Sequence, residues 1–275
     1  MQKVKIGEFM KELYDYTDSD QSHYNPTCDT IKAGDPEKPF NGKVAVSMFP
    51  APDVVRAAKE WGASLLIVHE PTYYDHWDSI QTLESTTGFK RKILGMKRDL
   101  LENSGLAVYR YHDHPHHAEE DLIAVGEVTH FGLRGTWVNE HKYGVSEFIL
   151  EKPMTVPDIA KALEKNLGIA HVRICGSTDH LVKRIGLNFG TPGHVEENLE
   201  HCELVLTGEI TEWRQAEFVR DCTQLGIPRA IIVMGHTCSE RDGMKILPDI
   251  IQQHFPGSEA KYFESGDAYT FTDQL

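Results

Sequence analysis

A single aliphatic run limits most strongly what this chain can fold into. Residues 65–68 read Leu-Leu-Ile-Val and lead directly into His69, Glu70 and Pro71. An unbroken apolar run of this length is typical of a strand buried on both faces of a parallel sheet. Pro71 cannot donate a hydrogen bond to a neighbouring strand, so we expect the strand to end there. Ligands of open α/β sheets bind beyond the carboxyl ends of the strands, so His69 and Glu70 face the expected site, unless they only cap the sheet.

The rest of the chain alternates between strand and helix patterns, which predicts an α/β fold with mixed sheets. Two stretches have a similar order of elements, so we expect two α/β subdomains, the first formed by residues 1–130 and 230–275 and the second by 131–229. We expect strands at 44–49, 65–69, 106–111, 147–150, 172–175, 183–189, up to 206, and 230–234. We expect helices at 1–16, 53–61, 89–103, 118–131, 155–168, 212–225 and 241–254, and a short helix after residues 190–193.

Three details of this interpretation are specific enough to check. Residues 17–42 are polar and contain proline and glycine, which predicts a long loop. Residues 132–144 are expected to be a connection between the two subdomains. Ser239 followed three residues later by Asp242 has the spacing of a capping box, so we expect it to start the last helix beside His236 and Glu240.

The charge balance excludes several classes of partner. The 275 residues include 42 acidic and 28 basic side chains, a net charge of −14. Binding to nucleic acid or to an anionic membrane needs clustered Lys and Arg, so we expect neither. The first residues lack the apolar core of a signal peptide, and no apolar run is long enough to span a membrane. We therefore expect a cytoplasmic protein with a small-molecule substrate and, because its five cysteines form no CxxC pair, free thiols.

Histidine is the unusual residue type: the chain has 15, and several of them cluster at the ends of predicted strands. One strand ends at His69 and Glu70, a second runs into residues 112–117, and a third precedes His236 and Glu240. Each segment alone is weak evidence, because a histidine tract can simply be solvated. The carboxyl ends of parallel strands in one sheet meet at one edge, so the three segments would converge. Imidazole and carboxylate groups together predict a metal centre.

Several short motifs resemble those of one family. The family has His-His-Pro where this chain has residues 69–71, and a His-Thr-Asn-Leu-Asp motif where this chain has residues 112–116. Its Thr-Gly-Asp/Glu segment matches residues 207–209, and its Gly-His-x-x-Ser-Glu segment matches residues 235–240. An early Asn-x-Gly-Leu-x-x-Gly segment is met only loosely by residues 28–35. Over nearly its whole length the chain thus resembles the NIF three-like family, whose members carry a dinuclear metal centre and are often described as GTP cyclohydrolase I type 2.

The resemblance implies a set of metal ligands and a cleft between the subdomains that holds them. Glu70 stands where the family has a second histidine, and His116 stands where it has an aspartate, so the two exchanges together preserve the number of nitrogen and oxygen ligands. The implied ligands of two divalent ions (Zn, Mn, Fe, Co or Ni) are His69, Glu70, His116, His236 and Glu240, with Glu240 as the bridge. His112 and His117 are the expected acid–base groups, and Asp113 and His114 are further candidates beside them.

The expected function is that of a metal-dependent hydrolase in which the paired ions activate water. The resemblance points to a nucleotide such as GTP as substrate, although the chain contains no P-loop or other nucleotide motif. Phosphoester cleavage suits paired metals equally well, and a non-catalytic metal-binding scaffold is the alternative from another class. The resemblance also implies a homo-oligomer, specifically a hexamer. The inserted domain that longer relatives carry between their halves is absent from this sequence.

Overall fold

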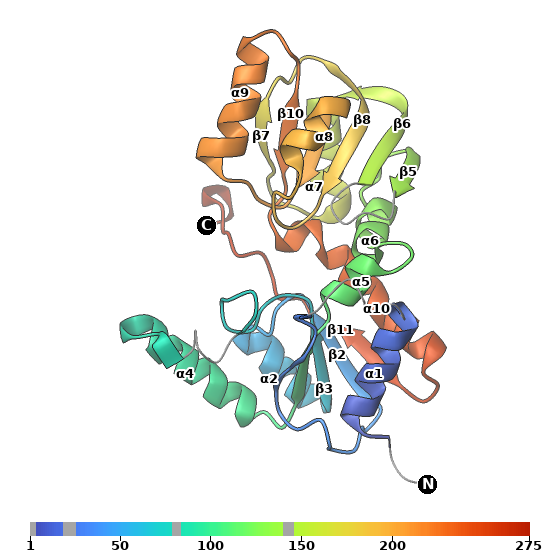
Figure 1. Ribbon diagram of the computed structural model, residues 1–275, viewed down its shortest axis with the longest axis vertical. Coiled ribbons are helices and arrows are strands. Elements are labelled where there is room, and N and C mark those ends of the chain that lie inside the picture. Colours follow the sequence, from blue (N-terminus) through green and yellow to red (C-terminus); the bar gives the residue numbers. More distant parts are fainter. Residues whose placement is uncertain (1–3, 19–25, 79–83, 140–145) are drawn as a thin grey trace. The chain divides into compact units, whose positions relative to one another are not determined.

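The computed structural model describes residues 4–18, 26–78, 84–139 and 146–275 (Figure 1). The chain divides into two compact units. Unit 1 comprises Met1–Ala118 and Met244–Ser265, and unit 2 comprises Glu119–Gly243 and Gly266–Leu275. Within the described ranges, no helix has both the length and the apolar character needed to cross a membrane.

Unit 1 is built on a five-stranded sheet whose centre is the predicted aliphatic strand. Its order is β1 (Ile31–Ala33), β4 (Ala107–Arg110), β3 (Leu65–Val68), β2 (Lys43–Ser47) and β11 (Glu259–Tyr262). Strand β1 is antiparallel to β4, and the other neighbours are parallel. All four residues of β3 are buried, which confirms the expectation from its unbroken apolar sequence.

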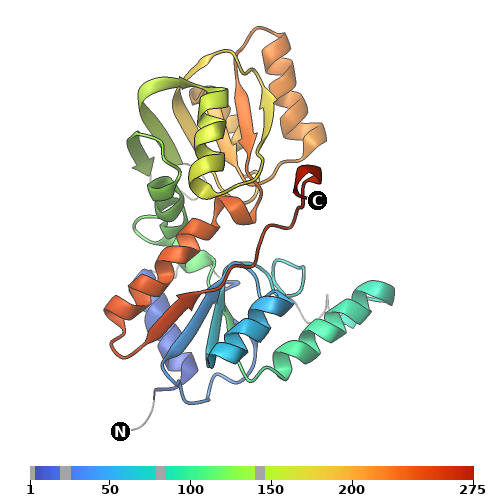
Figure 2. The ribbon, with the colours of Figure 1, turned by 180° about the vertical axis from the view of Figure 1, so that it is seen from behind.

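Helices cover both faces of this sheet. Helices α2 (Pro52–Trp61) and α4 (Gly88–Glu102) share one apolar cluster with the sheet, which includes Val55, Leu66 and Leu101. Helix α1 (Ile6–Thr17) lies on the opposite face from α2 (Figure 2) and buries its apolar stripe as predicted. Unit 1 also contains α5 (Asp113–His117) and most of α10 (Arg241–His254).

Unit 2 is built on a six-stranded mixed sheet. Its order is β5 (Gly135–Asn139), β6 (Ser146–Thr155), β8 (Leu181–Asn188), β9 (Leu204–Thr207), β10 (Ala230–Val233) and β7 (Arg173–Gly176). Strands β8, β9 and β10 are parallel, and the other pairs are antiparallel. Among the described residues, its helices include α6 (Leu122–His130), α7 (Val156–Leu167), α8 (Val195–His201) and α9 (Glu217–Gln224), with one π-helical turn (Glu212–Ala216) before α9 and short 3-10 helices at Thr237–Ser239 and Thr272–Gln274.

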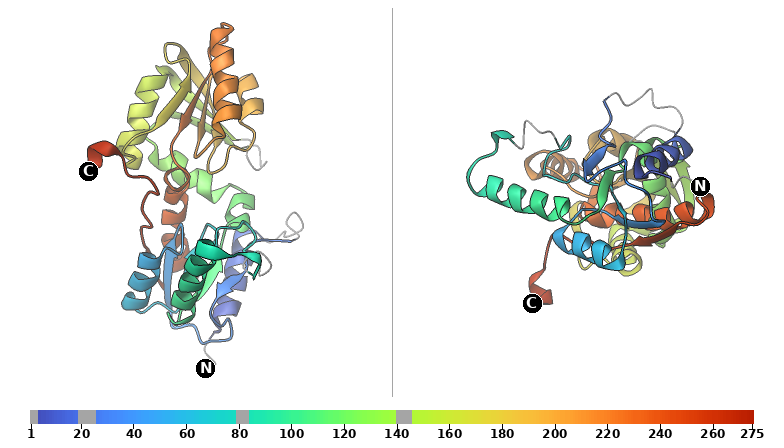
Figure 3. Two further views of the ribbon diagram at one scale, coloured as in Figure 1. Left: turned by 90° about the vertical axis from the view of Figure 1, so that its left-hand side faces the viewer. Right: turned by 90° about the horizontal axis from the view of Figure 1, so that it is seen from below.

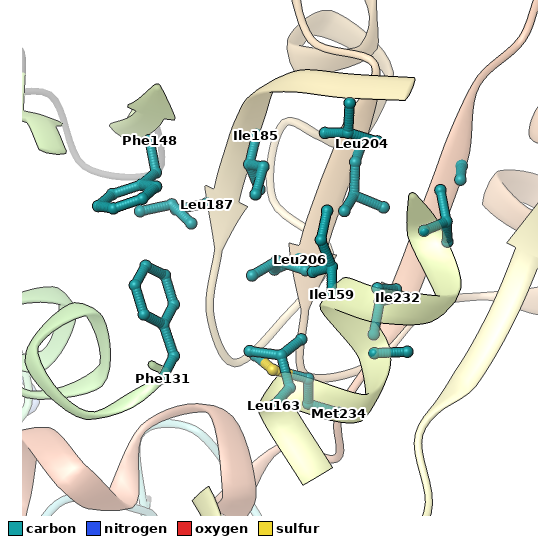
Figure 4. Close-up of a cluster of buried hydrophobic side chains, with 14 of the residues drawn as sticks. Phe131, Phe148, Ile159, Leu163, Ile185, Leu187, Leu204, Leu206, Ile232 and Met234 are labelled. Atoms are coloured by element: carbon teal, nitrogen blue, oxygen red, sulfur yellow. The ribbon is translucent and has the colours of Figure 1, made fainter. Parts of the chain in front are cut away.

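The core of unit 2 forms where α7 meets this sheet. Ile159 and Leu163 of α7 are fully buried and point toward Leu206 and Ile232 (Figure 4). Phe131 and Phe148 stack edge to face with ring centroids 4.8 Å apart and extend the same cluster. The Thr155 hydroxyl accepts a hydrogen bond from the Asp158 amide and caps α7, and Gly168 ends the helix in a left-handed conformation. The predicted α/β fold with two mixed sheets is therefore confirmed.

Three strands lie where the sequence predicted none. The predicted loop at 17–42 contains β1, the predicted connection at 132–144 contains β5, and the tail contains β11. All three are edge strands, which are solvated on one side and need no long apolar run. Their hydrogen-bond partners β4, β6 and β2 are distant in sequence, so a local pattern could not reveal them.

The predicted boundary between the subdomains is wrong near residue 230. Strand β10 pairs with β9 and β7, so residues 230–243 belong to unit 2 rather than to the first subdomain. Its sequence Ala-Ile-Ile-Val is buried throughout and therefore requires neighbours on both sides, which the six-stranded sheet provides. His236 and Glu240 consequently stand in unit 2.

The capping box predicted at Ser239 does not form. The Asp242 amide donates instead to Oε1 of Glu127 on α6, at 2.9 Å. The Ser239 hydroxyl donates to the His236 carbonyl at 2.9 Å and accepts from the Gly190 amide at 2.9 Å. A buried carboxylate from another helix thus satisfies the start of α10, and the serine ties two loops together instead.

Candidate metal centre

Three imidazole rings gather at one edge of the unit 1 sheet. His69 follows β3, and His112 and His116 follow β4, the parallel neighbour of β3. The ring centroids are 4.7 Å apart for His69 and His112, 5.1 Å for His69 and His116, and 5.0 Å for His112 and His116. One ring nitrogen from each lies within 4.8 Å of the others. We call these residues the three-histidine group.

The hydrogen bond of His69 fixes which nitrogen of its ring carries a proton. Nδ1 lies 3.0 Å from the Tyr111 carbonyl oxygen, which can only accept, so Nδ1 is the donor. Burial, and secondarily the neighbouring His112, hold the pKa of His69 well below its usual value, so the ring is neutral near pH 7. Nε2 therefore keeps its lone pair, as metal ligation requires.

Asp113 orients the second ring of the group. Its Oδ1 lies 3.0 Å from Nδ1 of His112, and its Oδ2 accepts from the Thr27 hydroxyl at 2.7 Å and the Cys28 amide at 2.9 Å. Burial alone would raise the pKa of Asp113, but the hydrogen bonds from His112, Thr27 and Cys28 outweigh it and hold the pKa well below its usual range. A carboxylate that holds an imidazole in this way is typical of metal sites.

The loop that carries these histidines is held by Asp29. This buried carboxylate accepts from the backbone amides of His112 at 2.6 Å and His114 at 2.9 Å, and its Oδ2 lies 2.7 Å from Nδ1 of His114. The His114 ring also stacks on Tyr14, with centroids 4.2 Å apart. His114, which the sequence proposed as an acid–base candidate, thus contributes to the position of the loop.

A buried arginine stands behind His69 and Glu70. Arg110 of β4 is completely buried, and its Nε donates to the His69 carbonyl at 2.9 Å. Another guanidinium nitrogen donates to the His76 carbonyl, and a third lies 3.6 Å from Oε2 of Glu70. The guanidinium thus places a buried positive charge beside the Glu70 carboxylate. The sequence did not identify Arg110, because it ends a short buried strand and has the appearance of a structural residue.

Two further histidines lie close to the group in sequence or in space. His117, predicted as an acid–base residue, ends α5 and is partly exposed. The ring of His76 lies 5.9 Å from that of His112, and burial, with Arg110 and His112, lowers its pKa. His76 follows no predicted strand, so the rule that identified the other histidines could not identify it.

Unit 2 holds a second group of candidate ligands, which we call the His236 group. Nδ1 of His236 lies 3.2 Å from Oε1 of Glu209, and Nε2 lies 3.3 Å from Oε2 of the buried Glu240. Gly190 makes room for this arrangement, because a Cβ built there would lie 2.2 Å from Glu240 Oε1. An imidazole between two carboxylates is a mixed donor set that first-row divalent metals accept.

The expectation that one sheet gathers all three segments is correct only in part. It explains His69 and His112–His117, which follow adjacent strands of the unit 1 sheet. His236 and Glu240 follow β10 of the other sheet. The residues predicted as ligands therefore follow strands of two different sheets, and His112 lies among the ligand candidates rather than apart from them.

The chemistry of unit 1 fits a divalent metal ion. The three imidazoles include one held in its neutral form, one oriented by a carboxylate, and Glu70 beside them. Imidazole nitrogen with carboxylate oxygen suits Zn, Mn, Fe, Co or Ni and does not select among them. His69, Glu70, His112 and His116 are therefore the residues of unit 1 that can hold such an ion.

The comparisons with known proteins agree with this fold. A solved structure named as the protein ybgI, of unknown function, has a TM-score of 0.74 at 17% identity and aligns over 97% of this chain and 100% of its own. A Bacillus cereus protein described as related to NIF3 has a TM-score of 0.72 at 13% identity, over 98% of this chain and 100% of its own. At these identities the likeness concerns the fold alone.

A sequence relationship extends over most of the chain. A Clostridium perfringens (strain 13 / Type A) protein named "GTP cyclohydrolase 1 type 2 homolog" is 24% identical over 218 residues, which span 76% of this chain and 77% of that protein. The profile of the family Duf34/NIF3 (NGG1p interacting factor 3) matches residues 30–266 and so includes both groups of candidate ligands. This match confirms the resemblance found in the motifs, and the chain belongs to the Duf34/NIF3 family.

Proposed function

We propose that this protein is a metal-dependent hydrolase with a dinuclear metal centre. The proposed ligands are His69, Glu70 and His116 from unit 1 and His236 and Glu240 from unit 2, with Glu240 as the bridge. The observation that carries the proposal is the three-histidine group, in which the Tyr111 carbonyl orients His69 and the Asp113 carboxylate orients His112. A purely structural cluster would not need a neutral, oriented imidazole.

The chain's own residues would prepare the centre for catalysis. The Tyr111 carbonyl keeps the lone pair of His69 on Nε2, and Arg110 balances the charge of Glu70. Asp113 orients His112, which lies beside His69 and His116 and can serve as a further ligand or transfer a proton from its Nε2. His117 is a second candidate for proton transfer. When bound, the paired ions would lower the pKa of a water molecule and so supply hydroxide near neutral pH.

The name of the Clostridium relative supports a nucleotide as the first substrate class to test. Opening of a purine ring and cleavage of a phosphoester both require an activated water molecule, so the same centre would serve either reaction. A screen should therefore begin with GTP, read by the ultraviolet absorbance of the ring, and continue with phosphoesters. A non-catalytic metal-binding scaffold would bind metal and hydrolyse none of these compounds.

Elemental analysis of the untagged protein tests the metal centre directly. We expect about two ions per chain in the parent, the number implied by paired sites, and less metal in His69→Ala, His116→Ala and Glu240→Ala. His201→Ala is the matched control, because this histidine is exposed at the end of α8 and should leave the metal content unchanged. A parent protein that stays metal-free after incubation with Zn or Mn would refute the proposal.

A further inference from the structure

A cavity of about 800 Å³ lies in unit 1 between edge strand β1 and helix α4. Its volume is in the range of small-molecule sites, about 300–1,000 Å³. Figure 3 shows α4 as a long helix at the side of the unit 1 sheet. The cavity is lined by residues 30–34, by Tyr73, Trp77 and Asp78 of the loop after β3, by Glu84, and by one face of α4.

The face of α4 that lines the cavity is mostly polar. It presents Arg91, Leu94, Gly95, Arg98 and Glu102, whose spacing of three or four residues places them on one side. Leu94 belongs to the apolar cluster that packs α4 on the sheet, and the three charged residues lie beside that cluster. A Cβ built on Gly95 would meet no atom within 4 Å, so the glycine leaves the space open.

The polar groups around the cavity are fixed at one end and adaptable at the other. Lys32 Nζ and Asp78 Oδ2 lie 3.8 Å apart, and their side chains are only 5% and 2% exposed. On α4, Nε of Arg98 lies 3.8 Å from Glu102 Oε1. A guanidinium has five N–H donors, so Arg98 can hold Glu102 and a second anion. The lining carboxylates Glu84 and Glu102 can accept from N–H groups of a ligand.

The aromatic side of the cavity is close to the three-histidine group. Trp77 is 49% exposed, and its ring lies 4.8 Å from that of His76, which lies 5.9 Å from His112. On the other side, the lining residue Thr30 directly follows Asp29, the carboxylate that holds the histidine loop. Two segments therefore link the cavity to the candidate metal centre: Trp77 with His76, and Thr30 with Asp29.

We propose that this cavity binds a planar ring that carries an anionic group, such as a mononucleotide. The ring lies against Trp77 and Tyr73, the anion lies at Arg91 and Arg98, and the lining carboxylates accept from N–H groups of the ring. The proposal rests on the proposed function only in identifying this ligand as part of the substrate. The binding itself depends on residues outside the metal ligands.

Isothermal titration with GMP tests the cavity without reference to activity. We expect GMP to bind both the metal-free and the metal-loaded protein. Guanosine, which lacks the anion, and inorganic phosphate, which lacks the ring, should each bind about tenfold or more weakly, because each loses one set of contacts. Absence of GMP binding in both forms of the parent protein would overturn the proposal.

Gly95→Leu is the sharpest variant, because Gly95 lines the cavity and a Cβ built on it meets no atom within 4 Å. Leucine is a better helix former than glycine, so the melting temperature should stay the same or rise while GMP binding is lost. Arg98→Gln should weaken GMP binding about tenfold or more through loss of a charged donor. Met96→Gln is the control, since Met96 is exposed on α4 and does not line the cavity.

The outcomes separate this proposal from the proposed function. His69→Ala should lower the metal content and leave GMP binding intact. Gly95→Leu should abolish GMP binding and leave the metal content unchanged. A parent protein that binds GMP but no metal would support the cavity and refute the hydrolase. Gly95→Leu protein that is folded and binds GMP as the parent does would refute the cavity as the ligand site.

Discussion

Asp113 affects the candidate metal centre although we do not propose it as a ligand. It is a half-buried anion that accepts from His112, Thr27 and Cys28, so its charge is fixed beside the three-histidine group. Burial raises the pKa of the neighbouring Cys28 thiol, which therefore stays protonated and donates to Oδ1 of Asp113 at 3.2 Å. The orientation of His112 consequently depends on a residue that a search for ligands alone would omit.

We expect Asp113→Asn to weaken metal binding about ten- to a hundredfold, because the amide carries no charge to hold the His112 ring. Competition with a chromophoric chelator measures the change. Asp179→Asn is the matched control, since this exposed carboxylate accepts only a local hydrogen bond from Ser177 in unit 2. Equal metal affinity in Asp113→Asn and the parent would show that the carboxylate has no such role.

Lys97 is a buried cation that should make stability depend on pH. Burial lowers the pKa of Lys97 to about 8, although the negative charge of Asp78 acts to raise it. The unfolded chain, with a lysine pKa of about 10.4, binds more protons between these two values, so stability rises with pH from about 8 to 10.4. Below pH 8 the full penalty for burying the ammonium remains.

We therefore expect Lys97→Met to increase the free energy of unfolding at pH 7 by about 2–3 kcal/mol, less the lost contact with the Tyr74 ring. The advantage over the parent should shrink as the pH rises to 10. Urea unfolding of both proteins at several pH values measures this difference. A constant difference across the range would contradict the assignment to Lys97.

At the scale of elements, α6 and α10 cross at two glycines within unit 2. A Cβ built on Gly126 would lie 2.4 Å from the Gly243 Cα, and one on Gly243 would lie 2.4 Å from the Ile123 Cα. Such close backbone approach excludes any side chain at the crossing. The same crossing brings Glu127 to the start of α10, where it replaces the predicted cap.

Gly126→Ala should destabilise the protein by about 1–3 kcal/mol or more, because the overpacking outweighs the better helix propensity of alanine. Gly95→Ala is the matched control on α4, where open space beside the residue leaves only the propensity gain of about 0.5–1 kcal/mol. The urea midpoints should therefore move in opposite directions. A shift in the same direction would show that the crossing tolerates a side chain.

The sequence predicted best those elements whose own apolar pattern shows which of their faces are buried. Strand β3 is apolar throughout because both of its faces are covered, and α1 shows its buried stripe directly. Strands β1, β5 and β11 were missed because an edge strand depends on a partner elsewhere in the chain. His69 and His116 were identifiable at strand ends, whereas Asp29 and Arg110 are defined by contacts that only the tertiary structure creates.

At the scale of the whole molecule, unit 2 exposes several large apolar side chains around α9. Trp213 is 79% exposed, Leu225 78% and Ile227 48%. Exposed apolar residues of this kind commonly mark contacts between subunits. They agree with the homohexamer that the family resemblance implies, which we retain as a proposal.

Light scattering should give a mass of about six chains if the assembly has this symmetry. Changing Trp213 and Leu225 to serine should reduce the mass, because the contacts would lose their apolar area. Phe89→Ser is the control, since Phe89 is 77% exposed on α4 in unit 1. A parent protein that is monomeric at micromolar concentration would contradict the proposed assembly.

The return of the chain to unit 1 determines the order in which the protein can fold as it is synthesised. Strand β11 is an edge of the first sheet but is made only after all six strands of the second. Until the ribosome has passed Tyr262, β2 lacks its outer neighbour and presents unpaired backbone groups to other chains. A chain that stalls or is cut after Gly243 would therefore retain every strand of unit 2 and still be prone to aggregate through unit 1.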